Sequence, residues 1–172
     1  ITDQLHCWGE NLIGVENTKS VPTGSFQNLE MGLAHSCALD LDGLPHCWGA
    51  NDVGQADPPA VNMVNIGVGY QEQTCGVKQN GEIVCWGSDN FGGFPPPPAG
   101  SYTDVAVGGD FFNLHACAIA QDQSIECWGD NDFGQLNAPV GQFTQITAGG
   151  GFTCALNVAG TIDCWGANFL GE

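Results

Sequence analysis

The sequence predicts an all-β fold, a propeller-like array of four antiparallel blades, from three observations. Eight of the nine cysteines form four pairs, and the two members of every pair are ten residues apart. Five cysteines open the tripeptide Cys-Trp-Gly, which recurs at intervals of 37 to 42 residues. An apolar segment ending in glycine precedes each cysteine pair. Self-similarity at such a period is typical of propellers, solenoids and arrays.

The first element of each repeat is this apolar segment of seven residues. Its fourth and sixth residues are apolar, and alternation with period two predicts a strand with one buried face. The closing glycine is typical of a tight bend or of a close backbone approach. The segments are 26–32, 63–69, 102–108 and 143–149, and the alternating residues are Leu29 and Met31, Ile66 and Val68, Val105 and Val107, and Ile146 and Ala148.

The residues between two paired cysteines are interpreted as a hairpin. In three repeats a residue pair that favours positive φ stands at or near the midpoint, namely Asp42-Gly43, Asn80-Gly81 and Ala159-Gly160. The third repeat has Gln121-Asp122-Gln123 there, so we expect a turn of another type. A turn at the midpoint places the two cysteines opposite each other on neighbouring antiparallel strands, within reach of a disulfide.

The cysteine pairs therefore predict four disulfides, each contributing about 2.5–3 kcal/mol in the chain-entropy description. Zinc ligation is the alternative, but zinc-binding cysteines cluster within a few residues, and no two cysteines in this chain are closer than ten residues. Disulfides persist in oxidising compartments, so we expect a secreted or extracellular protein, or one of the bacterial periplasm or cell surface. The predicted bridges are Cys37–Cys47, Cys75–Cys85, Cys117–Cys127 and Cys154–Cys164.

A second turn follows each Cys-Trp-Gly, with Asn or Asp at the fourth place counted from the tryptophan. Asn and Asp bond to nearby backbone and tolerate left-handed conformations, so a recurrent loop anchor is one interpretation. Calcium binding is the other, and it would be the only cofactor. None of these strings supplies the five or six spaced oxygen donors of a dedicated calcium loop, so no metal site is assigned. The calcium candidates are Asp52, Asp89, Asp130 and Asp132.

The whole chain, 1–172, is predicted to be one repeat domain with an incomplete fifth unit split between the termini. Cys7 has no partner at the ten-residue spacing, which is typical of an intermolecular bridge, a missing partner or a reactive thiol. Three interpretations stay open: a small four-bladed ring closed by the first stub, a segment of a larger propeller, or head-to-tail pairing of stubs. The partial units are 1–7 and 165–172, and the repeats are 8–47, 48–85, 86–127 and 128–164.

Charge and hydropathy exclude several classes of function. The formal net charge is −17, with Lys19 and Lys78 as the only basic residues apart from histidine, so we expect no nucleic-acid binding. No apolar run approaches the roughly 18 residues that span a bilayer, so membrane insertion is not expected. The acidity favours solubility, divalent cations and basic partners.

The sequence predicts no catalytic residues, and the protein is not expected to be an enzyme. The histidines His6, His35, His46 and His115 each stand one or two residues before a cysteine, where a hydrogen bond within the blade explains them. No nucleophile can be placed beside a histidine and an acid, and no pair of carboxylates stands out among the nineteen. Phosphate loops, dinucleotide fingerprints and zinc-protease motifs are missing.

Aromatic residues in irregular loops are the candidate binding residues. Exposed aromatics on a rigid scaffold are typical anchors for proteins or sugar rings. Packing between blades is the alternative, and we favour it for Phe91 and Phe133, which occupy matched positions. The proline run 95–98 would be stiff and extended. The binding candidates are Tyr70, Phe94, Phe111, Phe112 and Phe152.

The order of these motifs resembles the repeats of the regulator of chromosome condensation family. The first repeat carries it as His35-Ser36-Cys37-Ala38-Leu39, Asp42-Gly43, Cys47-Trp48-Gly49 and Gly54-Gln55. The third and fourth repeats match nearly as well, and the second departs, with Gln73-Thr74-Cys75-Gly76-Val77. The resemblance implies a β-propeller, usually of seven blades. The founder's roles in nucleotide exchange and chromatin binding conflict with the acidity and the disulfides.

The secreted bacterial branch of that family, which includes β-lactamase inhibitory proteins, is the nearer comparison. The resulting expectation is a non-catalytic extracellular module whose loops bind a protein or glycan partner. One alternative is a fibre or surface-layer subunit that polymerises with itself through its incomplete terminal repeats. Another is a secreted enzyme inhibitor. Resemblance of fold does not by itself identify a partner.

Overall fold

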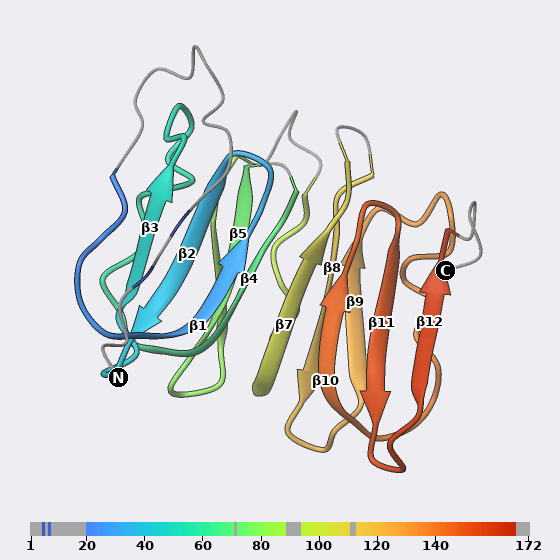
Figure 1. Ribbon diagram of the computed structural model, residues 1–172. Coiled ribbons are helices and arrows are strands. Elements are labelled where there is room, and N and C mark those ends of the chain that lie inside the picture. Colours follow the sequence, from blue (N-terminus) through green and yellow to red (C-terminus); the bar gives the residue numbers. More distant parts are fainter. Residues whose placement is uncertain are drawn as a thin grey trace.

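In a computed structural model of the chain, all regular elements among the described residues are strands, grouped into four three-stranded antiparallel sheets (Figure 1). The structure describes residues 5, 7, 20–70, 72–88, 94–110 and 113–167. Each sheet is one blade, and its strands follow one another as a meander. An all-β array of four antiparallel blades is the fold that the repeats predict.

The strands of each blade are called inner, middle and outer in chain order. Within a blade the inner strand pairs with the middle strand, and the middle strand pairs with the outer strand. The blades consist of β1 (Phe26–Met31), β2 (His35–Asp40) and β3 (Pro45–Gly49); β4 (Met63–Val68), β5 (Gln73–Lys78) and β6 (Ile83–Gly87); β7 (Tyr102–Gly108), β8 (His115–Ala120) and β9 (Ile125–Gly129); and β10 (Phe143–Ala148), β11 (Phe152–Asn157) and β12 (Ile162–Gly166).

The paired cysteines lie directly opposite each other on the middle and outer strands, as Cys37 and Cys47 do on β2 and β3. Their Cα atoms are 4.0 to 4.1 Å apart in all four blades, and each pair forms a disulfide. The pairing is the one that the ten-residue spacing predicts.

The turn between the middle and outer strands has the same conformation in every blade. Gly43, Gly81 and Gly160 have φ of 90°, 87° and 83°, and Gln123 in the third blade has φ of 72°. Each of these residues donates its N–H to the carbonyl three residues earlier, as Gln123 does to Ala120 at 2.9 Å. The expectation of another turn type in the third repeat is therefore wrong. The register of the two strands selects the turn, and Gln123 adopts a positive φ that glycine takes without strain.

Consecutive blades pack side by side, each through its inner and middle strands against the inner strand of the next blade. In Figure 1 the first blade lies at the left and the fourth at the right, so the described strands form an open arc. The substantial contacts between the described blades join neighbours in sequence, and none of them joins the first blade to the fourth.

The first blade departs from the predicted burial because no described blade covers its inner strand. The alternation predicts a buried face for Leu29 and Met31, but their side chains are 47% and 68% exposed. The equivalent Ile66 and Val105 of the next two blades are only 1% and 2% exposed. Alternation correctly identifies the apolar side of the strand, whereas burial of that side requires a neighbouring blade.

Candidate functional site

At each blade interface, the front face of one blade meets the back face of the next. The front face carries the disulfide, and the back face carries the apolar residues of the inner strand. At the first interface Cys37 and Leu39 pack against Met63, Ile66 and Val68. The second interface packs Cys75 and Val77 against Tyr102, Val105 and Val107, and the third packs Ile119 against Phe143 and Ile146. The first two disulfides therefore belong to the cores between blades.

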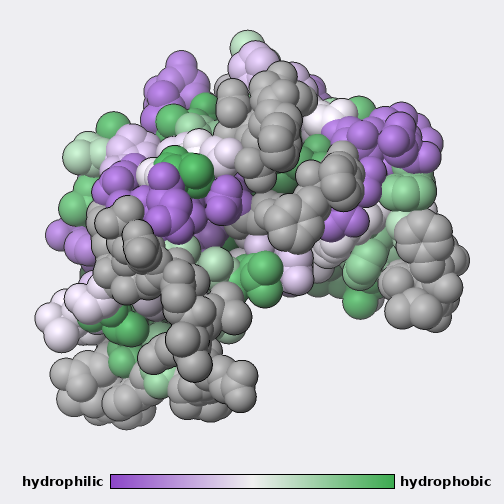
Figure 2. Space-filling view, turned by 90° about the horizontal axis from the view of Figure 1, so that it is seen from above, coloured by the Kyte–Doolittle hydropathy of each residue, from purple (hydrophilic) through white to green (hydrophobic). Residues whose placement is uncertain are grey.

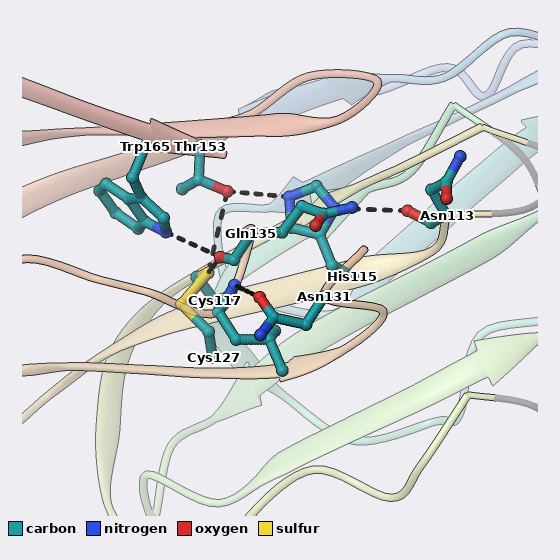
Figure 3. Close-up of a disulfide and its surroundings, with 9 residues drawn as sticks. Asn113, His115, Cys117, Cys127, Asn131, Gln135, Thr153 and Trp165 are labelled. Carbon is teal, nitrogen blue, oxygen red and sulfur yellow. Dashed lines mark hydrogen bonds between the residues drawn. A yellow bond between two sulfur atoms is a disulfide. The ribbon is translucent and has the colours of Figure 1, made fainter. Parts of the chain in front are cut away.

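Histidines connect consecutive blades at two of the three interfaces. Nε2 of His35 lies 2.7 Å from the Thr74 hydroxyl, and Nε2 of His115 lies 2.9 Å from the Thr153 hydroxyl (Figure 3). Gln73 holds the equivalent place in the second blade, where it is buried, and Ala116 of the third blade stands in the place of the threonine. These hydrogen bonds run between blades rather than within one, which corrects the expectation from the sequence.

Burial controls the protonation of these two histidines. It lowers the pKa of His35 to about 4, and it also lowers the pKa of His115. Both rings are neutral at pH 7, so each can exchange one hydrogen bond with a threonine hydroxyl without placing a charge between the blades. The His motif is thus an interblade connector.

The tryptophan of Cys-Trp-Gly holds the loop that connects two blades. The indole N–H of Trp86 donates to the Gln55 carbonyl at 3.1 Å, and that of Trp165 donates to the Gln135 carbonyl at 2.8 Å. Figure 3 shows Trp165 and Gln135 next to the Cys117–Cys127 disulfide. Gln55 and Gln135 are fully buried. These contacts give the Trp and Gln of the repeat a structural role.

The connecting loop is anchored by the Asn and Asp side chains that follow Trp-Gly. Oδ1 of Asn51 accepts the N–H of Ala56 at 2.9 Å, and Oδ1 of Asn131 accepts the N–H of Leu136 at 2.8 Å. Oδ1 of Asp130 accepts both the N–H of Asp132 and the side-chain amide of Gln135. The loop-anchor interpretation accounts for these contacts.

The described residues contain no group of three or more His, Cys, Asp or Glu side chains that could hold a metal ion. Of the calcium candidates, Asp52, Asp130 and Asp132 belong to this part of the chain, and Asp89 lies outside it. The Asp130 carboxylate already accepts hydrogen bonds within its own loop. We therefore assign no calcium site to these loops.

A polar hollow of about 410 Å³ lies along the inner strands, beside the front face of the fourth blade. Its polar lining includes Glu30, Asn65 and Asp104, each from a different inner strand. Asn65 and Asp104 bridge to the next blade, since Asn65 accepts the N–H of Val105 and Asp104 accepts the N–H of Ile146. The hollow combines interblade hydrogen bonds with two carboxyl groups.

These two carboxyl groups are harder to ionise than ordinary ones. Burial raises the pKa of Asp104. Burial raises the pKa of Glu30 as well, and the negative charge of Asp104 adds to that effect. Burial thus disfavours the ionised form of both carboxyl groups in this hollow.

An apolar hollow of about 370 Å³ lies on the side of the array where the loops between inner and middle strands gather. The backbone N–H of Leu33 in the first of these loops donates to the carbonyl of Tyr70 in the second, at 3.1 Å. Figure 2 looks down on this end of the molecule and shows hydrophobic residues set among hydrophilic ones. The side chains of Met31, Leu33 and Tyr70 line the hollow and are exposed.

The predicted aromatic residues have different surroundings. Tyr70 is exposed at this hollow, as expected for a binding residue. Phe94 instead packs on Trp128, with ring centroids 6.2 Å apart, inside the core of the second interface. Phe152 is half-buried on β11, and Phe111 and Phe112 lie outside the described residues. Phe94 is therefore better explained as a core residue that covers Trp128 of the third blade.

Sequence reasoning missed Met31 and Leu33 as surface residues of the hollow. Met31 occupies an alternating position predicted to be buried, and Leu33 follows the glycine that closes the strand. Their place in the first repeat is the available signal, because no described blade precedes the first one. Only the arrangement of blades shows that these side chains face solvent.

The remaining sequence candidates are His46, His6 and Cys7. His46 bonds to the Asp40 carboxylate at 3.1 Å and stacks edge-on against Phe26, so it is occupied within its blade. His6 lies outside the described residues. Cys7 is exposed and makes no disulfide within the chain. Among the described residues, no helix is long and apolar enough to cross a membrane.

Comparisons with known proteins agree with this geometry. The family model for the regulator of chromosome condensation (RCC1) repeat matches residues 143–172. No curated protein matches the chain. The CRINKLY WD40 ectodomain of the Arabidopsis thaliana receptor kinase ACR4 is a similar structure, with a TM-score of 0.72, 29% identity, and coverage of 99% of this chain and 58% of that one.

Two further structures extend the comparison. The ectodomain of the Physcomitrella patens receptor kinase CR4 has a TM-score of 0.72 and 30% identity, over 96% of this chain and 47% of that chain. Prp20p from Saccharomyces cerevisiae has a TM-score of 0.65 at 18% identity, over 84% of this chain and 45% of that one, and supports the fold alone. The chain spans about half the length of these ectodomains.

The fold and the interfaces define an RCC1-like propeller array whose blades are stapled by disulfides. It resembles the ectodomains of plant receptor kinases in particular. The four disulfides together with that similarity indicate an extracellular or otherwise oxidising compartment.

Proposed function

We propose that the protein is a non-catalytic binding module of the extracellular space. We also propose that a protein or glycan partner binds in the apolar hollow beside the loops between inner and middle strands. The observation that carries the proposal is the exposure of Met31, Leu33 and Tyr70 around that hollow. Large apolar and aromatic side chains that converge on a concave surface are typical of binding sites.

The scaffold under the hollow supports this function because it is rigid. Each blade is closed by a disulfide, and neighbouring blades share an apolar core. Loops on such a scaffold keep their shape before binding, which reduces the entropy lost when a partner is held. Similarity to ectodomains named as parts of receptor kinases is consistent with a role outside the cell.

The surroundings of the ionisable groups support a protein without catalysis. His35 and His115 are buried and hydrogen-bonded between blades, and His46 is bonded to Asp40. The carboxyl groups of Glu30 and Asp104 share one hollow, but Asp104 is already engaged by a backbone N–H. A histidine that connects blades is poorly placed to act as a general base.

The test combines a glycan array with affinity enrichment from extracellular fractions. The wild-type chain is compared with a Leu33→Ser, Tyr70→Ser variant, which changes two exposed residues of the hollow and leaves the blade cores intact. Leu41→Ser is the matched control, because Leu41 is also exposed but lies in a hairpin turn at the opposite end of the blade. We expect a ligand that binds the wild type and Leu41→Ser and loses at least about tenfold in affinity for the double variant.

A ligand that binds all three proteins equally would place the binding surface elsewhere and contradict the assignment to the hollow. Turnover of a ligand during binding would contradict the non-catalytic role. A bound extracellular enzyme whose activity falls on binding would specify the function as inhibition, as in the secreted bacterial branch that the repeats resemble. The polymer-forming alternative involves the partial repeats 1–7 and 165–172, most of whose residues lie outside the described part of the chain.

A further inference from the structure

The side of the array that holds the apolar hollow also carries the turns that follow Cys-Trp-Gly. Backbone hydrogen bonds join the start of these turns to the loops between inner and middle strands. In the first blade the N–H of Ala50 donates to the carbonyl of Ala34 at 2.8 Å. In the third blade the N–H of Asp130 donates to the carbonyl of Leu114 at 2.8 Å. These turns and loops therefore share one face of the array, called the loop face, which Figure 2 shows from above.

The loop face carries carboxylates next to the exposed apolar residues of the hollow. Glu72 follows Tyr70 by two residues in the loop of the second blade and is half-buried. Asp52 is exposed in the turn that starts beside Ala34, the residue after Leu33. Each of the two exposed apolar residues of these loops thus has a carboxylate in its own loop or in the turn joined to that loop.

The described part of the chain supplies no lysine or arginine to offset this charge on the loop face. Its one lysine, Lys78, ends β5 at the hairpin turns, on the opposite face, and forms an ion pair with Glu82 there. His35 and His115 lie nearer the loop face, but burial lowers the pKa of both, so they are neutral at pH 7. The loop face is therefore negative, in a chain whose formal net charge is −17.

An apolar hollow beside carboxylates fits side chains that are apolar along their length and positive at their end. The stems of Lys and Arg pack on apolar surface while the charged group stays in water. The exposed ring of Tyr70 attracts a cation that lies over its face. Anionic glycans, nucleic acids and acidic proteins are repelled by the same charges, and a neutral glycan gains nothing from them.

We propose that the loop face binds a basic protein segment, in which an apolar residue fills the hollow and neighbouring Lys or Arg side chains face Asp52 and Glu72. This partner class rests on the proposed function, because the hollow is the same. An ordinary protein interface buries about 800 Å² on each partner, enough to include the hollow and the turns around it. Opposite charges on the two surfaces accelerate association and exclude acidic competitors.

The experiment selects binders from a phage-displayed library of random peptides of about twelve residues, on the intact immobilised chain in about 0.15 M NaCl. Sequencing of the library before and after selection measures the frequency of each residue type. We expect Lys and Arg together to become at least about twofold more frequent, while Asp and Glu become rarer and large apolar residues stay common. The affinity of the selected peptides should fall between about 0.05 and 0.5 M NaCl.

Two variants that remove the same number of charges locate the site. Asp52→Asn with Glu72→Gln removes two carboxylates from the loop face, and Asp42→Asn with Asp122→Asn removes two from the hairpin turns of the opposite face. All four residues lie outside the strands, so the variants keep the fold. For the selected peptides we expect the dissociation constant to rise at least about fivefold with the loop-face variant and less than about twofold with the control.

Equal losses of affinity in these two variants would overturn the proposal, because the peptides would then respond to the charge of the whole chain. Selected peptides that are no richer in Lys and Arg than the library would overturn it too. If those peptides nevertheless lose affinity for the Leu33→Ser, Tyr70→Ser variant, the hollow remains the binding site and only the basic partner is wrong.

Basic peptides that bind the Leu33→Ser, Tyr70→Ser variant as tightly as the wild type would contradict both the basic segment in the hollow and the assignment of binding to the hollow. A selection that enriches no peptide would overturn the basic segment alone. Binding in the glycan array that depends on Leu33 and Tyr70 would in that case still support the proposed function.

Discussion

The interface between the second and third blades and the open faces at the two ends are built from the same repeat positions, yet their burial differs. In the middle of the array Val105 and Val107 lie against the disulfide of the preceding blade and are buried. At the start of the array the equivalent Leu29 and Met31 face solvent. The apolar pattern of one repeat therefore describes half of an interface, and the neighbouring blade supplies the other half.

The polar contacts of the array lead to the same conclusion. Hydrogen bonds cross the first interface between His35 and Thr74 and the third between His115 and Thr153. The middle interface has Gln73 in place of a histidine. A residue of the family motif is thus interpreted correctly only together with its partner in the next repeat. Four sets of variants test this architecture in order of decreasing effect, and the first two compare covered faces with open ones.

The largest difference is expected between equivalent apolar residues of the inner strands. Ile66→Ala removes a buried side chain from the first interface and should lower the free energy of unfolding by about 2–5 kcal/mol. Leu29→Ala at the equivalent exposed position should cost less than about 1 kcal/mol. Denaturant unfolding of both variants and the wild type measures the difference, and equal losses would show that the first blade is covered in solution.

Next in size is the loss of a disulfide. Replacing both Cys117 and Cys127 by Ala should cost about 2–4 kcal/mol of stability, because the unfolded hairpin regains its conformational freedom. Under limited reductant, peptide mass mapping should find Cys154–Cys164 opened before Cys117–Cys127, because Cys164 is exposed and Cys117 is fully buried. Reduction of the buried bridge first would contradict the assignment of open and closed faces.

The third prediction concerns pH and the histidines between blades. Burial lowers the pKa of His35 in the folded state from 6.5 to about 4. The unfolded chain therefore binds more protons, so this contribution to stability is present above pH 6.5 and is lost as pH falls toward 4. His35→Gln, which copies the residue at the middle interface, should lose less stability than the wild type between about pH 7 and pH 4.5 in thermal melts. An unchanged pH dependence would show that His35 does not titrate in this way.

The smallest predicted effect is at the hollow along the inner strands. Burial raises the pKa of Asp104, so its ionised form is unfavourable in the folded state, and its contribution to stability falls as pH rises above its ordinary range. Asp104→Asn keeps an oxygen for the N–H of Ile146, as Asn65 does for Val105, and should raise the melting temperature at pH 7 by about 2–4 °C. Asp42→Asn on the exposed hairpin turn is the control, and a melting temperature lowered by Asp104→Asn would contradict the prediction.

Local spacing and composition are enough to predict the strands, the four disulfides and the anchored loops. The turn at Gln123 is predicted wrongly because the register of the flanking strands, rather than the residue type, determines its positive φ. Phe94 is predicted as a binding residue, but it packs beside Trp128. Phe94 belongs to the connecting loop that has no glutamine equivalent to Gln55 and Gln135.

The candidate site is only partly predictable from the sequence. The irregular loop that holds Tyr70 predicts a binding residue, and Tyr70 lines the apolar hollow. No pattern identifies Met31 and Leu33 of the same hollow, because their exposure depends on the absence of a blade before the first one in the described array. Alternation reports the chemical character of a strand face and carries no information on what lies against it.

Each blade is specified locally, because its strand order, its hairpin turn and its covalent bridge depend on residues within about 40 positions of one another. The assembled array is needed to show which blade faces are covered, where His35 and Thr74 meet, and which apolar side chains remain in solvent. The physical reason is that these properties arise between repeats. A pattern repeated in every blade cannot distinguish a blade with two neighbours from a blade with one.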